Sequence, residues 1–258
     1  MAGGNALKFL QTKILLLEMK LELKNITKYV SGIPGNNFLL LENVNLLIES
    51  SKGEITTLLG PVRSGKSTLL RIISGIEKAD LGDVLIDDKR SSGILPYIPE
   101  KSASFPWFTV EENLKDLPAL KRDAGELIKM VGLDGYEDHI PDNNSPGFRF
   151  RISLAKAIAV NPSILLIDES LKSMKPETKV EIIKLLKEIS SMYGIGIIYS
   201  TSDISDAVSL SEKIFLMRKN PGTIFHRFLT HGERMKDISG IEELLIKENL
   251  INKANFSI

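Results

Sequence analysis

The sequence GPVRSGKST at positions 60–68 has the residue types and the spacing of a phosphate-binding loop. Its pattern matches GxxxxGK[ST], in which glycines let successive backbone N–H groups point at phosphate oxygens. Lys66 would bridge the outer phosphates of a nucleoside triphosphate, and the Ser67 hydroxyl could ligate Mg²⁺. The candidate triphosphate-binding residues are therefore Gly60, Pro61, Val62, Arg63, Ser64, Gly65, Lys66, Ser67 and Thr68.

A second candidate group follows later in the chain, where the apolar residues 164–167 end in two carboxylates, Asp168 and Glu169. Ligands of open α/β sheets bind at the carboxyl ends of the strands, so Asp168 would hold Mg²⁺ beside Ser67. Glu169 would then lie near the γ-phosphate and could polarise the attacking water. A buried strand that simply runs into a solvated turn has the same pattern, so this interpretation depends on the phosphate loop that precedes it.

The elements that must position these groups alternate between strands and helices. Residues 54–59 are predicted to form a buried strand entering the loop, and residues 69–74 a helix that ends at Gly75. Further strands are predicted at residues 20–24, 39–48, 83–87, 163–168 and 195–200. Further helices are predicted at residues 124–131, 151–160 and 176–190, and Thr109 and Glu112 have capping-box spacing. This alternation predicts an α/β fold with a parallel sheet covered on both faces.

Composition narrows the function classes. The chain has 258 residues, enough for one large α/β domain or a domain with an inserted subdomain. Its 33 basic and 33 acidic residues balance, which gives no electrostatic footprint for nucleic acid. The absence of cysteine excludes disulfides, cysteine catalysis and thiolate metal sites, and it is compatible with a reducing cytoplasm. The three histidines, His139, His226 and His231, have no zinc-site spacing.

The N-terminal segment, residues 1–18, has two interpretations. Lys8 and Lys13 interrupt its apolar residues, so it matches neither a membrane span nor a signal peptide. Apolar residues recur on one helical face, which would suit a docking helix; they are Leu7, Leu10, Ile14 and Leu17. The alternative is an extension upstream of a start at Met19.

Over about residues 20–225 the chain resembles the ATP-binding subunits of ABC transporters. Beyond the two motifs above, LLRIISG at 69–75 and GDVLID at 82–87 are similar to the family's stretch after the phosphate loop. RISLAKAIAVNP at 151–162 is similar to the helix that leads from the family's signature motif to its Walker B strand.

Two further segments resemble particular branches of that family. PWFTVEEN at 106–113 is similar to a segment of importer subunits, and NPGTI at 220–224 resembles an ending found in the nitrate, sulfonate and taurine branch. These segments favour an importer.

The resemblance implies a fold and a set of partners. The fold is a P-loop-type ABC cassette over residues 19–228, with a parallel-sheet core, an antiparallel β subdomain and an inserted helical subdomain at about 98–160. Residues 229–258 would form a short helical tail. The implied ligands are ATP and Mg²⁺, and the implied partners are a second ABC subunit and an integral membrane subunit, with no nucleic acid. The location implied is the cytoplasmic face of the cell membrane.

The signature motif departs from the family pattern. LSGGQ aligns with residues 144–148, which begin at Asn144. Ser145 and Gly147 match the pattern and are the candidate contacts to a partner's nucleotide. Pro146 has no N–H, so one backbone donor towards the partner's γ-phosphate is missing.

Three other positions also depart. Glu100 stands at the Q-loop glutamine and adds a negative charge beside the phosphates, although a glutamate can still coordinate metal. Lys175 replaces the usual D-loop aspartate. Ser202 stands where the switch histidine belongs; it stays a candidate ATP contact, but a serine carries no positive charge. The resulting candidate metal ligands are Ser67, Glu100 and Asp168.

The aromatic residue that would stack on adenine is Tyr29, with Phe38 as the alternative. Two functions then compete. The chain is either an ATPase subunit that drives a membrane partner, with reduced turnover, or a catalytically weak nucleotide-bound subunit of an asymmetric heterodimer or another complex. The intact phosphate loop, Asp168 and Glu169 favour the first, and the joint loss of the signature, D-loop and switch residues favours the second.

Overall fold

The structure is a computed structural model that describes residues 19–31, 37–50, 53–90, 93–101, 104–115, 121–142 and 145–248. Within these ranges it contains ten strands and seven helices in a mixed α/β arrangement. Both interpretations of residues 1–18, and the alignment of Asn144, lie outside the described residues.

The first sheet is antiparallel, with the strand order β2-β1-β4-β5. Its strands are β1 (Met19–Ser31), β2 (Asn37–Ser50), β4 (Leu81–Ile86) and β5 (Lys89–Arg90). β1 and β2 extend well beyond the predicted residues 20–24 and 39–48. Register shifts between Leu23 and Tyr29 interrupt the alternation of apolar residues in β1, but β1 stays paired with β2 after these shifts, as far as Ser31. The interruption explains why the sequence predicted a shorter strand.

The second sheet has the order β10-β9-β3-β8-β7-β6. Its strands are β3 (Ile55–Leu59), β6 (Tyr97–Ile98), β7 (Ile164–Asp168), β8 (Gly196–Thr201), β9 (Lys213–Arg218) and β10 (Thr223–Leu229). The pairs from β9 across to β6 are parallel, as predicted, but β10 pairs with β9 in antiparallel fashion. A short turn at residues 219–222 joins β9 to β10, and such a turn can return the chain only antiparallel.

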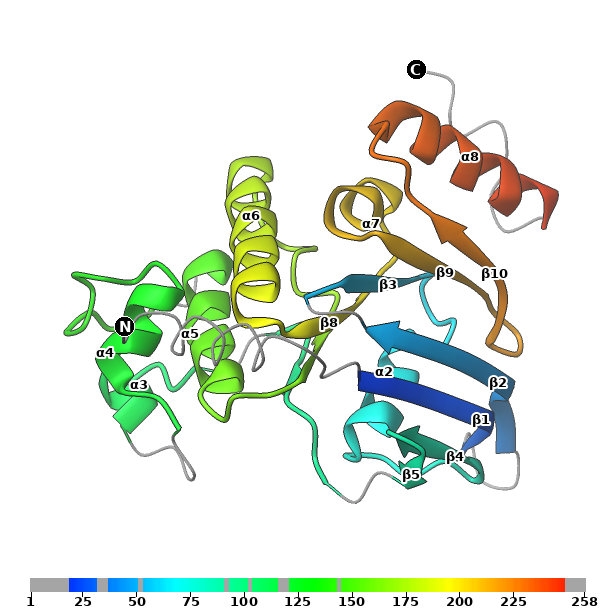
Figure 1. The fold of residues 1–258 in the computed structure, drawn as a ribbon, viewed down its shortest axis with the longest axis horizontal. Coiled ribbons are helices and arrows are strands. Elements are labelled where there is room, and N and C mark those ends of the chain that lie inside the picture. Colours follow the sequence, from blue (N-terminus) through cyan, green and yellow to red (C-terminus); the bar gives the residue numbers. More distant parts are fainter. Residues whose placement is uncertain are drawn as a thin grey trace, which may run out of the picture.

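Helices cover both faces of this second sheet, and the antiparallel sheet and the small helices lie at opposite ends of the molecule (Figure 1). The helices are α2 (Lys66–Ser74), α3 (Glu112–Lys115), α4 (Ala124–Met130), α5 (Pro146–Ile158), α6 (Pro176–Tyr193), α7 (Ile204–Leu210) and α8 (Arg234–Lys247). The predicted capping box holds, because Thr109 N–H donates to Glu112 Oε2 (2.8 Å) and Glu112 N–H to Thr109 Oγ1 (3.2 Å).

α5 begins at Pro146, whereas the sequence predicted a start at Arg151. The proline occupies the first helical turn, where its missing N–H would have had no helical partner in any case. Of the residues aligned with the signature, Ser145 is therefore the N-cap and residues 146–148 form the first turn of this helix.

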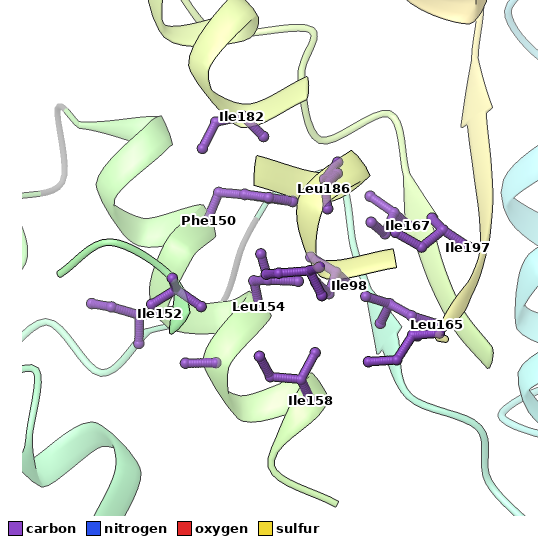
Figure 2. Close-up of a cluster of buried hydrophobic side chains, with 14 of the residues drawn as sticks. Ile98, Phe150, Ile152, Leu154, Ile158, Leu165, Ile167, Ile182, Leu186 and Ile197 are labelled. Atoms are coloured by element: carbon purple, nitrogen blue, oxygen red, sulfur yellow. The ribbon is translucent and has the colours of Figure 1, made fainter. Parts of the chain in front are cut away.

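β7 and β8 are buried on both faces, which explains their nearly continuous apolar sequences. Leu165, Ile167 and Ile197 pack against Phe150 and other side chains of α5 and α6 (Figure 2). The alternate residues of the same strands pack on the opposite side, against α2 and the antiparallel sheet; they are Ile164, Leu166 and Ile198. This double burial fixes the register of β7 and places its last residue, Asp168, at the edge of the sheet where β3 also ends. None of the helices described is long and apolar enough to cross a membrane.

Candidate active site

The phosphate loop joins β3 to α2, as the sequence predicted, and it packs tightly against its neighbours. A Cβ at Gly60 would lie 2.8 Å from Met217 O, and one at Gly65 only 2.5 Å from Leu41 Cδ2. Gly65 also has φ +90°, a left-handed conformation that favours glycine, immediately before α2 begins. The loop therefore needs both glycines, and it lies at the amino end of α2, where backbone N–H groups favour an anion.

Lys66 is the buried cation of this loop, with 3% of its side chain exposed. Its Nζ donates to Gly60 O (2.9 Å) and Pro61 O (3.0 Å) and lies 3.1 Å from Glu169 Oε1. Burial lowers the pKa of Lys66, and the Glu169 carboxylate opposes that effect. Three oxygen atoms thus surround the ammonium, and phosphate oxygens could replace them.

Asp168 accepts hydrogen bonds from the hydroxyl groups of three different elements. Ser67 of α2 donates to Oδ1 (3.0 Å), Ser200 of β8 also donates to Oδ1, and Tyr97 of β6 donates to Oδ2 (2.9 Å). Burial and the adjacent carboxylate raise the pKa of the Tyr97 hydroxyl, so it remains a donor. The paired Ser67 and Asp168 oxygens suit Mg²⁺, which takes one or two protein oxygens and completes its shell with waters and phosphates.

Glu169 follows Asp168 and faces the same loop. Its φ of +41° is unusual for a residue with a side chain, and its N–H donates to Ser200 O (3.0 Å). Backbone strain of this kind clusters at functional sites. The carboxylate, 11% exposed, lies between two lysines, because Oε2 is 3.3 Å from Lys172 Nζ. The hydrogen bond with Glu169 raises the pKa of Lys172.

The family model for ABC transporters matches residues 41–172, which contain the loop and both carboxylates just described. The chain belongs to the ABC transporter ATP-binding family.

Three relatives illustrate this membership. An aliphatic sulfonates import ATP-binding protein of Bacillus thuringiensis subsp. konkukian is 34% identical over 80% of this chain and 84% of its own length. A spermidine/putrescine import ATP-binding protein of Clostridium novyi is also 34% identical, over 79% of this chain, which spans only 61% of that relative. An ATP-binding cassette solved as a dimer with ADP and phosphate is 27% identical, with a TM-score of 0.67, over 82% of this chain and 99% of its own.

Among the positions predicted to depart from the family pattern, Glu100 lies in the loop after β6. Its carboxylate is 56% exposed, and its Oε1 is 3.8 Å from Lys172 Nζ. Of the three predicted metal ligands, the structure brings Ser67 and Asp168 together. Glu100 is linked to them through Lys172 and Glu169, so its role as a metal ligand stays a prediction.

The predicted partner-site residues begin α5. Ser145 is the N-cap residue, and its N–H donates to Asp142 O (3.2 Å). Gly147 is buried, and a Cβ there would lie 2.4 Å from Thr178 Cγ2 of α6. Helix packing alone therefore requires this glycine, whatever it contacts across a dimer.

The remaining candidates surround the loop. Ser202 is exposed between β8 and α7 and lines a cleft of about 520 Å³ that Lys172 also lines. Tyr29 (44% exposed) pairs with Leu39 of β2, the strand that also carries Phe38 and whose Leu41 packs on Gly65. Both aromatic candidates therefore lie on the sheet that contacts the loop through Leu41, and their role at adenine stays a prediction.

Within the loop, Val62 is exposed, Arg63 has φ +66° and Thr68 Oγ1 accepts from Arg71 (3.1 Å). The buried Ser64 Oγ has no hydrogen-bond partner among the described residues. An orphaned hydroxyl in this position is compatible with a polar ligand.

Sequence reasoning missed Tyr97, Ser200 and Lys172. Ser200 could have been found, because it ends the buried strand predicted beside β7. Nothing in the sequence indicated that the Tyr97 hydroxyl would reach the site, because Tyr97 lies in a short apolar segment. Lys172 comes three residues after Glu169. Side chains with this spacing contact each other only where the backbone between them forms a turn, and the sequence did not indicate one.

Proposed function

We propose that this chain is the ATP-binding subunit of an ABC importer, in which ATP binding and hydrolysis move a membrane partner. The observation that carries the proposal is the joint placement of Lys66, Ser67, Asp168 and Glu169 around one phosphate loop. These are the groups required to bind a triphosphate, organise Mg²⁺ and activate water.

Each of these residues has a separate task in hydrolysis. Lys66 exchanges its carbonyl and carboxylate partners for the outer phosphates. Ser67 and Asp168 would hold Mg²⁺, which would supply positive charge to neutralise the phosphate oxygens. Glu169, once released from Lys66, accepts a hydrogen bond from the attacking water and orients it towards the γ-phosphate. Tyr29 or Phe38 packs against the adenine.

Turnover is reduced in this proposal. Ser202 lacks the positive charge of a switch histidine, and Pro146 lacks a backbone donor. Both groups would otherwise stabilise charge on the γ-phosphate, and the loss of one such donor typically slows the chemical step about a hundredfold.

The proposed partners are a second ABC subunit and an integral membrane subunit on the cytoplasmic face of the cell membrane. The similarity to import ATP-binding proteins supports an importer. One of these relatives serves sulfonate import and the other spermidine/putrescine import, and both are 34% identical to this chain. The proposed organisation is a cassette at residues 19–228, with the helical subdomain at about 98–160 and a helical tail at 229–258. In this proposal the membrane partner selects the substrate that is transported.

A second function, that of a weakly catalytic regulatory subunit, is favoured by one observation. Pro146, Lys175 and Ser202 all depart at positions that, by family resemblance, act across a dimer interface. A homodimer would carry each departure at both of its sites, whereas a heterodimer with an unaltered partner would keep one complete site.

Hydrolysis measured on the purified chain and on the Glu169→Gln variant tests the proposal, and only a fast parental rate separates it from the regulatory subunit, because slow turnover fits both functions. The proposal expects tight Mg-ATP binding and slow turnover that Glu169→Gln abolishes. Several turnovers per second in the parent, lost in the variant, would exclude the regulatory subunit. Failure to bind ATP would exclude both functions. Co-purification of the native complex identifies the second subunit directly.

A further inference from the structure

Lys172 joins two acidic residues, Glu169 and Glu100, by ion pairs. It lies in the loop between β7 and α6, with its Nζ 3.3 Å from Glu169 Oε2 and 3.8 Å from Glu100 Oε1. Glu169 is the proposed water-activating carboxylate, and Glu100 adds a negative charge where the family has a neutral glutamine. One lysine therefore offsets a charge that the sequence has introduced and also touches the reactive carboxylate.

The pairing matters more once nucleotide is bound. In the ligand-free structure Lys66 holds one oxygen of Glu169 and Lys172 holds the other. When the outer phosphates take Lys66, Lys172 is the only other side-chain cation within 4.0 Å of Glu169 among the described residues. A nearly buried carboxylate left beside a phosphate without a cation would be strongly disfavoured.

Lys172 also lies on the correct side of the site to replace the missing histidine. It lines the same cleft as Ser202, and half of its side chain is exposed, so its long stem is free to follow a bound phosphate. The other lysine of that cleft, Lys179, is committed to Asp206, at 2.9 Å.

We propose that Lys172 is a positioning residue that orients Glu169 and supplies, at the γ-phosphate end of the site, the positive charge that Ser202 lacks. This inference rests on the proposed function, because it requires a bound triphosphate. It gives the departures at positions 100 and 202 a common explanation: Lys172, in the loop after β7, takes over the electrostatic role of a residue after β8.

The test uses the full-length chain with Lys172→Gln and Lys172→Arg, and the matched control is Lys187→Gln. Lys187 is exposed on α6, so its replacement makes the same change in net charge on the adjoining helix. Calorimetry gives the affinities for Mg-ATP and Mg-ADP, and phosphate release gives turnover. A fourth variant, Lys172→Gln with Ser202→His, tests whether a cation just after β8 replaces the one that was removed.

Lys172→Gln is expected to lower ATP affinity about fivefold and to leave ADP affinity unchanged, because only ATP presents a γ-phosphate to this lysine. Turnover should fall about tenfold, less than for loss of a fully buried donor because Lys172 is half exposed. Lys172→Arg should keep most of the ATP preference, Ser202→His should restore it in the double variant, and Lys187→Gln should match the parent.

Several results would overturn the inference. They are an unchanged ratio of ATP to ADP affinity in Lys172→Gln, an equal loss of both affinities that Lys172→Arg shares, and faster turnover in Lys172→Gln. If the parent binds ATP without measurable turnover, the affinity ratio alone decides. If the parent binds neither nucleotide, the proposed function fails first and the inference fails with it.

Discussion

Replacing Lys66 with alanine tests the phosphate site most directly, because this lysine has one task in the ligand-free protein and another in the complex. Without nucleotide its ammonium has three oxygen partners, two loop carbonyls and Glu169. With nucleotide it must exchange them for phosphate oxygens. Lys66→Ala is therefore expected to change both the free energy of unfolding and the affinity for Mg-ATP.

The two magnitudes follow from those partners. Removing one member of a buried ion pair costs about 3–5 kcal/mol of stability, and we expect the lower end because Glu169 keeps Lys172. ATP would replace hydrogen bonds that the Lys66 ammonium already makes in the ligand-free protein. The loss of Mg-ATP affinity in Lys66→Ala should therefore be modest. We expect at least a tenfold loss of affinity, about 1.4 kcal/mol.

The double variant Lys66→Ala with Glu169→Gln separates the two effects. It removes the unpaired carboxylate, so urea unfolding should show recovered stability, whereas calorimetry with Mg-ATP should still show weakened binding. Exposed Lys184 (77% exposed) provides the control, as Lys184→Ala should leave both quantities at the parental values. Unchanged ATP affinity in Lys66→Ala would remove the assignment of residues 60–68 as a phosphate loop.

Three further outcomes are expected. Asp168→Asn should leave metal-free nucleotide binding nearly intact and abolish the extra affinity that Mg²⁺ confers; equal magnesium dependence in variant and parent would contradict the role of Asp168. Tyr97→Phe removes one donor from this buried carboxylate and should cost about 1–3 kcal/mol of stability in urea unfolding; a change within error would show that water replaces the hydroxyl. Ser202→His together with Pro146→Gly should raise phosphate release at least tenfold, about 1.4 kcal/mol of barrier, and no gain would mean that neither position limits turnover.

The elements nearest the chemistry were the most predictable. The strand before the phosphate loop, the helix ending at Gly75 and the buried strand that ends in Asp168 all form where apolar pattern and glycine placement indicate. They were predictable because local sequence and tertiary burial favour the same conformation. β9 was missed although Ile214 to Met217 are apolar and buried, a pattern of the same kind.

The site was less predictable than the fold, because its hydrogen bonds join elements that are distant in sequence. Ser67 and Asp168 could be paired in advance, since a known chemistry requires a hydroxyl and a carboxylate on one metal. Tyr97 is brought to the same carboxylate only by the pairing of β6 with β7. The start of α5 was misplaced for a local reason, because a proline that normally interrupts a helix is tolerated in its first turn.

The hydroxyl of Tyr97 has a mechanical consequence. β6 is a two-residue edge strand, and the chain continues from it through Glu100 into the helical part of the molecule. The Tyr97–Asp168 bond therefore ties the carboxylate proposed to bind metal to the strand from which that part extends. If the helical part is pulled or rotated, the strain passes along β6 and must stretch this bond or move the carboxylate. The same bond transmits force in reverse, so a bound metal ion that holds Asp168 in place also stiffens the base of the helical part.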